Sequence, residues 1–361
     1  MNLLKKLLIW SIIAVLIESG MFFYLDKAYS RTSASDYKEV KSTTKSEKKT
    51  YNEVKVPENA ENVQVSFDGK YISYCENKEL KIVNTQDEKV QSVETKDNAT
   101  ISYFKWMPDS NWILICEKDS RDRINFYNYN PSKNSKNQLT DHDMKPLIIE
   151  LDSKNDKVEN IALSTASHVM YTKILHKNGK SDIYRSNVMN QIEKIKTPNN
   201  EIGNISILNL ASNLVYEDKE EEEIKSVTQT VIKNKKGDEK TSTNISSIDF
   251  QDNSKRVLLG TDTQDKVYIG ISEGGKISSI LFGDLKNSTS EWKNLKLPEV
   301  TDKSNIVITN SGNIYIKNQS KSSVKNVVTN AETQYTGNFI EIQDKYIYAL
   351  SNSKVIRTAL K

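Results

Sequence analysis

One short phrase recurs along this chain and limits what the chain can fold into. The phrase is clearest at residues 66–74, SFDGKYISY, where an apolar strand is expected to end, a polar turn follows, and an alternating aromatic and aliphatic strand begins. It returns at 107–115 as MPDSNWILI. A strand–turn–strand unit that repeats in this way predicts an all-β repeat protein. Weaker copies occupy residues 167–171, 212–216, 254–259, 312–316 and 344–348.

The spacing of the copies predicts how many strands each unit contains. Intervals of 32 to 57 residues leave room for three or four strands per unit. Units of about 40 to 50 residues with four strands each are typical of a β-propeller. The second strands are expected to begin at Tyr71, Trp112, Val169, Leu214, Val257, Ile314 and Tyr346. The strands of the first unit are expected at 62–67, 71–75, 80–84 and 90–94, and later third strands at 124–129, 182–186, 227–232 and 267–271.

The two ends of the repeat region predict how the ring closes. After Tyr346 the chain offers only one further strand, at 355–360, so the last unit lacks a strand. A lone strand at 51–56 precedes the first unit and is expected to complete the last one. The fold class is therefore an all-β propeller of seven blades, with six or eight as alternatives because the sixth repeat is weak.

The recurring phrase also resembles a known family pattern. Residues 68–72 and 108–113 look like the SPDG-type motif of TolB-like and WD40-like propeller repeats, although the Gly-His and Trp-Asp pairs of WD40 repeats themselves are absent. The resemblance is strong in the first two units and faint in the others. It implies a propeller fold and says little about activity, because propellers carry many unrelated functions.

The N-terminal residues predict a membrane anchor. Residues 1–6 contain two lysines, and 7–26 are apolar enough and long enough to form one transmembrane helix. The positive-inside rule then gives a single-pass protein of the cell membrane with an extracytoplasmic C-terminal domain. Cleavage at a signal-like Ala-Tyr-Ser at 28–30 is the alternative. Residues 27–52 are polar and predict a flexible tether, followed by the propeller at 53–361.

Glu18 stands within the predicted transmembrane helix. A carboxyl group at membrane depth is costly and indicates an intramembrane partner contact. The alternative is a protonated side chain that has no partner and is tolerated by its apolar neighbours. Both interpretations remain open at the level of sequence.

Composition excludes several classes of function. The net charge is +3, whereas nucleic-acid binders usually carry a strong basic excess, so we expect no nucleic-acid partner. Cys75 and Cys116 occupy equivalent places in neighbouring repeats and are expected to be unbridged. Two cysteines and three histidines without ligand spacing predict neither a metal nor a cofactor. The abundance of Asn, Lys and Ile suits a low-GC Gram-positive bacterium.

Some stretches match catalytic motifs formally, but the residues around them do not fit those motifs. Residues 270–274 match GxSxG around Ser272, but a strand is expected next where a nucleophile elbow needs a helix. The same stretch lacks the Ser or Thr of a phosphate loop. Residues 141–143, Asp-His-Asp, are expected to form a turn, and neither His168 nor His176 has a recognisable base or nucleophile beside it.

An acidic run at 217–223 has two interpretations. A solvated hairpin is favoured, and the alternative is a patch for a basic partner formed by Glu220, Glu221, Glu222 and Glu223. The sequence as a whole predicts a non-enzymatic module, held near the membrane, that binds or scaffolds a cell-envelope protein or polymer. The alternative is a small-ligand binder or an enzyme of hydrolase or lyase type at the mouth of the propeller channel.

Overall fold

A computed structural model describes residues 18, 21, 53–187, 192–233, 239–343 and 345–361. Glu18 and Met21 are helical and exposed. Apart from these two residues, the predicted tail at 1–6, the transmembrane helix at 7–26 and the tether at 27–52 lie outside the described residues. Within the part of the chain that is described, no helix is long and apolar enough to cross a membrane. The fold below is that of Glu53–Lys361.

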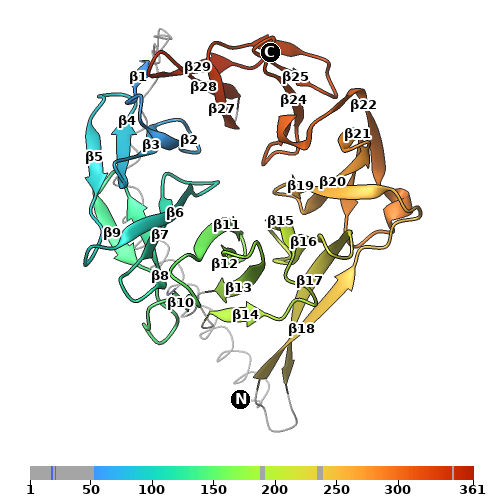
Figure 1. Cartoon of the computed structure of the whole chain (residues 1–361), viewed down its shortest axis with the longest axis horizontal. Helices are drawn as coiled ribbons and strands as arrows, with labels where there is room; N and C mark the ends of the chain where they lie inside the picture. The colour runs from blue at the N-terminus through green and yellow to red at the C-terminus, as the bar shows by residue number, and fades with distance from the viewer. Residues whose placement is uncertain (1–17, 19–20, 22–52, 188–191, 234–238, 344) are drawn as a thin grey trace, which may run out of the picture. The chain divides into compact units, whose positions relative to one another are not determined.

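Seven antiparallel sheets follow one another around a ring, so the described fold is a seven-bladed β-propeller (Figure 1). The six- and eight-bladed alternatives are therefore excluded. Blade 1 contains β2 (Glu61–Val65), β3 (Tyr71–Glu76), β4 (Glu79–Asn84) and β5 (Val90–Val93). Blade 2 contains β6 (Thr100–Trp106), β7 (Ile113–Lys118), β8 (Arg123–Asn130), β9 (Ser135–Gln138) and β10 (Ile148–Glu150). Blade 3 contains β11 (Lys157–Leu163), β12 (Val169–Leu175), β13 (Ser181–Asn187) and β14 (Glu193–Ile195).

The remaining blades repeat the same four-stranded meander from the channel outward. Blade 4 contains β15 (Ile202–Ile207), β16 (Leu214–Asp218), β17 (Glu223–Lys233) and β18 (Glu239–Ser247). Blade 5 contains β19 (Lys255–Thr261), β20 (Lys266–Glu273), β21 (Lys276–Asp284) and β22 (Lys293–Thr301). Blade 6 contains β23 (Ile306–Ile308), β24 (Ile314–Asn318), β25 (Ser323–Asn326) and β26 (Glu332–Gln334). Blade 7 contains β27 (Asn338–Gln343), β28 (Tyr346–Ser351), β29 (Lys354–Ala359) and β1 (Val54–Lys55), and the 3-10 turns are η1 (Thr289–Glu291) and η2 (Lys303–Asn305).

The predicted closure of the ring is confirmed. β1 pairs antiparallel with β29, with Val54 opposite Val355, and so supplies the outermost strand of blade 7. The main-chain N–H of Val56 also donates to Ser353 O at 2.8 Å. Val54 and Val56 are fully buried, whereas Lys55 between them is exposed. This alternation anchors the strand, because its apolar face packs into the core.

The predicted strand order is wrong in blade 5. Val257 was expected on the second strand but belongs to β19, the innermost one, and residues 267–271, expected as a third strand, lie in the second strand β20. The reason is local. Polar residues precede both β19 and β20, and both strands carry apolar residues in alternation, so the sequence pattern fits either register.

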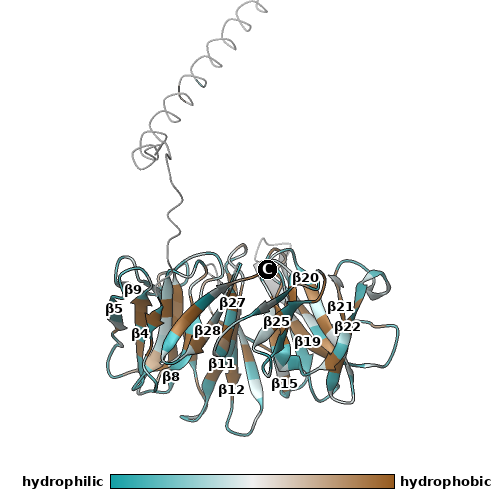
Figure 2. Ribbon diagram, turned by 90° about the horizontal axis from the view of Figure 1, so that it is seen from above, coloured by the Kyte–Doolittle hydropathy of each residue, from teal (hydrophilic) through white to brown (hydrophobic). Residues whose placement is uncertain are grey.

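Aromatic and aliphatic side chains of the second strands fill the space between blades. Tyr71, Tyr171, Tyr216 and Tyr348 are almost fully buried. At the junction of blades 1 and 2, the rings of Tyr71 and Trp106 stack with centroids 6.1 Å apart. Figure 2 shows that hydrophobic residues concentrate in the strands, whereas most loop residues are hydrophilic.

Candidate binding site in the central channel

The innermost strands of the blades enclose a central channel, and two cavities open within it. The larger, of about 720 Å³, is lined by β23, β27 and the turns that follow the innermost strands of blades 1, 2 and 6. The smaller, of about 370 Å³, is lined by blades 2 to 5. Both volumes fall within the range of ordinary ligand sites. Pro108, Leu259 and Asn310 line both cavities, so the two lie next to each other in the channel.

One position of the innermost strand joins neighbouring blades. This position is occupied by Gln64 in blade 1, Lys105 in blade 2 and Glu341 in blade 7. In each blade two further residues follow it before the turn begins. Gln64 Nε2 donates to Phe104 O at 3.1 Å, and Lys105 Nζ donates to Ile161 O at 2.9 Å. Each side chain caps a main-chain group on the unpaired inner edge of the next blade. Such groups need a partner when they are removed from water.

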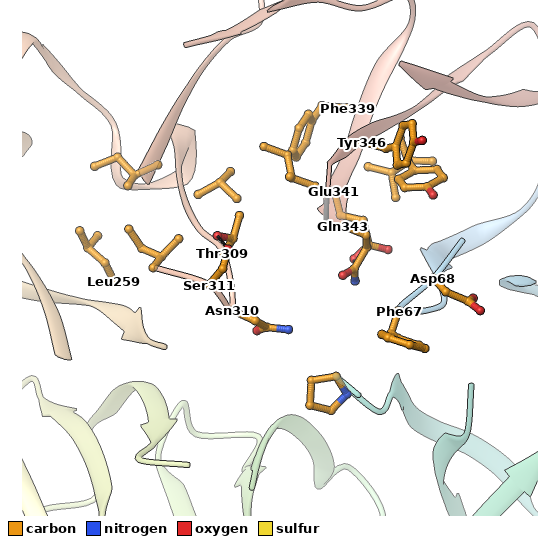
Figure 3. A pocket seen from close by; sticks show the side chains of 17 residues that line it. Phe67, Asp68, Leu259, Thr309, Asn310, Ser311, Phe339, Glu341, Gln343 and Tyr346 are labelled. Carbon is orange, nitrogen blue, oxygen red and sulfur yellow. Dashed lines mark hydrogen bonds between the residues drawn. The ribbon is translucent and has the colours of Figure 1, made fainter. Parts of the chain in front are cut away.

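Glu341 performs the same role as an acceptor at the closure of the ring. Its Oε1 accepts the main-chain N–H of Val65 at 2.5 Å, and its Oε2 accepts from Gln343 Nε2 at 2.9 Å. Figure 3 shows Glu341 and Gln343 directed toward the open centre of the larger cavity, with Asn310 extending from the opposite side and Phe67 at the margin. Glu341 therefore belongs both to the framework of the ring and to the lining of the site.

Burial perturbs the two ionisable groups at this position. The protein surroundings disfavour the charged carboxylate and raise the pKa of Glu341 to about 7, although hydrogen bonds from Val65 and Gln343 and the nearby Lys105 act in the opposite direction. Burial lowers the pKa of Lys105, and the charge of Glu341 opposes that shift. Perturbed groups in a cavity are typical of functional sites. Within the described residues the two form no ion pair.

The cavity lining is acidic although the whole chain carries a net charge of +3. Asp68, Asp109, Asp262 and Glu341 line the two cavities, and Lys105 is the only cation among the described lining residues. Asp68 and Asp262 are held by hydrogen bonds within their turns, because their Oδ1 atoms accept the main-chain N–H groups of Lys70 and Lys266. Acids thus outnumber cations in the lining, and the site favours a cationic ligand over an anionic one.

The same lining does not resemble a hydrolytic centre. Neither cavity includes a histidine, an arginine or a cysteine among the described residues. No group of three or more potential metal ligands exists among them either. Asn160, Asn204, Ser206 and Thr261 contribute amide and hydroxyl groups, which bind polar ligands by hydrogen bonds.

The Asp-His-Asp stretch forms a turn, as predicted. It lies in an excursion between β9 and β10, which interrupts the outermost strand of blade 2. Asp141 Oδ1 accepts the main-chain N–H groups of Asp143 and Lys145, both at 2.9 Å. His142 and Asp143 are exposed and point to no shared site. The carboxylate of Asp141 is therefore used to shape the turn.

The acidic run divides into a buried part and an exposed part. Glu217 and Asp218 are buried at the end of β16, where Asp218 pairs with Lys225 at 2.9 Å. The predicted patch, Glu220 to Glu223, is exposed in the turn before β17 and at its first residue. Glu221 also pairs with Lys225, and Glu222 pairs with Lys255, both at 2.5 Å. Glu223 also pairs with Lys225, at 3.9 Å. At least three of its four charges thus already have partners within the chain, and binding by this patch stays a prediction.

The GxSxG match is a hairpin. Gly274 and Gly275 have φ of +57° and +83° and connect β20 to β21 in a tight turn. Ser272 lies within β20, so the strand-to-helix elbow and the phosphate loop are both absent at this place. Cys75 and Cys116 are free, as expected.

His176 has partners that the sequence did not reveal. Its Nδ1 lies 2.9 Å from Asp156 Oδ2 and its Nε2 lies 3.0 Å from Asp182 Oδ2. Both carboxylates are buried, and Lys194 reaches Asp182 at 2.6 Å. The sequence showed no base or nucleophile beside His176, whereas the structure brings two carboxylates to it. Asp156 comes from the segment before β11, and this long-range approach left no signal in the local pattern.

Lys105 and Glu341 were also missed. Each is the one charged residue in its innermost strand, and a polar residue at the equivalent place in three blades was the available signal. Recognising it requires the correct register of all three strands. The partners of the two residues lie on other blades, and the sequence did not show which residues of those blades lie beside them.

Comparisons with known proteins support the fold. A family model described as eukaryotic translation initiation factor eIF2A, a WD40-like propeller family, matches residues 60–202, which cover blades 1 to 3 and less than half of the chain. No curated protein matches the sequence significantly. The narrower resemblance to TolB-like repeats stays a prediction.

Among solved structures, an oligogalacturonate lyase in complex with manganese is similar with a TM-score of 0.56 and 9% identity, covering 86% of this chain and 96% of that chain. A luciferin-regenerating enzyme gives a TM-score of 0.39 at 9% identity, covering 85% and 92%. A chain from a nidogen/laminin complex gives 0.41 at 11% identity, covering 73% and 92%. At these identities the likeness to the lyase shows the fold alone.

Proposed function

We propose that this protein is a membrane-anchored binding module whose propeller holds a ligand at the central channel. The observation that carries the proposal is the pair of adjoining channel cavities, which have an acidic and amide-rich lining, with Glu341 of raised pKa in the larger one. A large cavity with a few convergent polar groups is the place where a ligand is expected. The lack of a histidine, arginine or cysteine in the described lining favours binding over hydrolysis.

The partner is a component of the cell envelope, either a protein or a polymer. This part of the proposal follows from the predicted helix at 7–26, which would hold the propeller at the outer surface of the cell membrane. Glu18 would add a second contact by pairing with a polar group on a partner helix. The exposed Glu220 and its neighbours offer a subsidiary patch for a basic surface.

In-cell crosslinking followed by purification of the full-length protein in mild detergent tests the proposal. We expect a stoichiometric envelope component to be recovered, and we expect Asn310→Trp to abolish its recovery by filling the channel mouth. Asn310 is exposed and its side chain makes no described hydrogen bond, so the variant should fold. A protein that is recovered alone, or recovery that is unaffected by Asn310→Trp, would overturn the role of the channel.

The enzyme alternative has one observation in its favour. A carboxyl group whose pKa is raised to about 7 can exchange protons near neutral pH, as Glu341 would. If the channel catalyses a reaction on a recovered envelope polymer, Glu341→Gln should abolish turnover while the polymer still binds. Unchanged turnover, or no turnover in the native protein, would leave binding as the function.

A further inference from the structure

The innermost strands of blades 6 and 7 differ from the innermost strand of blade 1 in whether a side chain caps their main-chain N–H groups. In blade 1 the N–H of Val65 turns away from its own sheet and is capped by Glu341. Ile308 and Ile342 occupy the equivalent positions in β23 and β27. No side chain among the described residues caps the N–H of either one. These two strands therefore present free hydrogen-bonding groups to the channel.

The same two strands are also the least closely packed neighbours around the channel. β23 and β27 approach each other less than the innermost strands at the other six junctions. The larger cavity occupies this space, with Ile306 and Ile308 on one wall and Phe339, Ile340 and Ile342 on the other. A cleft with apolar walls and free strand edges suits an extended chain, because alternate side chains can pack on the walls while the main chain forms ladder bonds.

The charge of the cleft selects among such chains. Asp68 and Glu341 are the charged residues in the lining of the larger cavity, and both are acidic. Each oxygen of Glu341 accepts one hydrogen bond and retains room for another. A neutral glycan would offer this carboxylate hydrogen bonds alone, whereas a lysine side chain or an amino terminus would add a charge-assisted contact.

We propose that the cleft between β23 and β27 binds an extended basic segment of a partner protein, whose main chain pairs with the free edge of β23 and whose cation contacts Glu341. The proposal rests on the proposed function and names the chemical class of its ligand. It treats the partner as a protein and not as a polymer.

Fluorescence anisotropy with full-length protein in mild detergent tests this proposal at pH 8. The probes are labelled, acetylated pentapeptides of alternating threonine and valine with a central lysine, glutamine or glutamate. We expect the lysine peptide to bind at least about tenfold more tightly than the glutamate peptide, as a charge-assisted contact requires. N-methylation of the peptide bonds should weaken the lysine peptide by a similar factor, because it removes the ladder donors.

Matched variants locate the contact. Glu341→Gln should weaken the lysine peptide about tenfold and leave the glutamine peptide unchanged. Glu299→Gln, which alters an exposed acid on the outermost strand of blade 5, should change neither peptide. Asn310→Trp should abolish binding of all peptides, and an unchanged melting temperature would show that the loss comes from blocking the cleft.

The two proposals fail in different ways. Equal binding of the three peptides, no binding of any, or indifference to N-methylation would overturn the basic-segment proposal. If Asn310→Trp still abolished recovery of the cellular partner in that case, the channel would remain the binding site and its ligand would be of another class, such as a glycan. If neither peptides nor partner depended on Asn310, both proposals would be wrong.

Discussion

At the scale of single residues, one polar position of the innermost strands carries much of the chemistry of this propeller. The same strand position is Gln64 in blade 1, Lys105 in blade 2 and Glu341 in blade 7. All three bond the next blade, but only the last two bring charge into the channel. Framework and site therefore share residues, and substitutions at this position are expected to affect both stability and binding.

His176 illustrates a second kind of residue-scale effect, a pH-dependent contribution to stability. Burial alone would lower the pKa of His176, but hydrogen bonds and charge interactions with Asp156 and Asp182 outweigh it and raise the pKa. Because the folded pKa lies above the unfolded value of about 6.5, the stabilisation is complete below that pH. It is lost as pH rises through the folded pKa.

We therefore expect His176→Gln to lower the free energy of unfolding by roughly 2 kcal/mol at pH 6 and by much less at pH 9. Urea unfolding at the two pH values measures the difference. His142→Gln is the matched control, because His142 is exposed and should show no loss at either pH. An equal loss at both pH values in His176→Gln would mean that packing, not the charged network, accounts for its contribution.

At the scale of elements, the closure of the ring depends on a very short strand. β1 contributes only two ladder residues, and its ion pair between Glu53 and Lys354 is exposed and therefore weak. The stability of the closure must come from burial of Val54 and Val56 between neighbouring elements.

Val54→Asp is expected to lower the free energy of unfolding of the propeller by about 3 kcal/mol or more, because it places an unpaired charge in the core. Lys55→Asp, on the exposed face of the same strand, should have little effect. Thermal unfolding of both variants checks the expectation. Similar melting temperatures for the two variants would show that β1 is not needed to hold the ring closed.

At the scale of the whole molecule, the central question is where the propeller lies relative to the membrane. We expect an extracytoplasmic propeller in the membrane fraction, on the basis of the charges and the apolar run of residues 1–26. Cys116 is buried and Cys75 is partly buried, so the native thiols should give little background labelling.

Lys133→Cys provides an exposed label site on blade 2. A membrane-impermeant maleimide should modify this variant in intact cells, and the labelled protein should remain with carbonate-washed membranes. The unsubstituted protein serves as the control for Cys75. Modification that occurs only after the cells are lysed would place the propeller in the cytoplasm and would contradict the proposed topology.

The sequence by itself determined the architecture of the propeller. Turn residues and alternating strands are local signals, and their recurrence was sufficient to predict the blades, the free cysteines and the closure by 51–56. The local pattern assigned the wrong strand order where two adjacent strands have similar sequences, as at Val257 in β19, and it left six or eight blades as alternatives that only the structure excluded.

Only the tertiary structure decided where the candidate site lies. Glu341 and Val65 are 276 residues apart in sequence, yet ring closure brings them into a hydrogen bond. The channel cavity, the free edges of β23 and β27 and the carboxylates around His176 likewise arise between elements. The raised pKa of Glu341 has the same origin, because the burial that causes it depends on neighbours that local sequence does not specify.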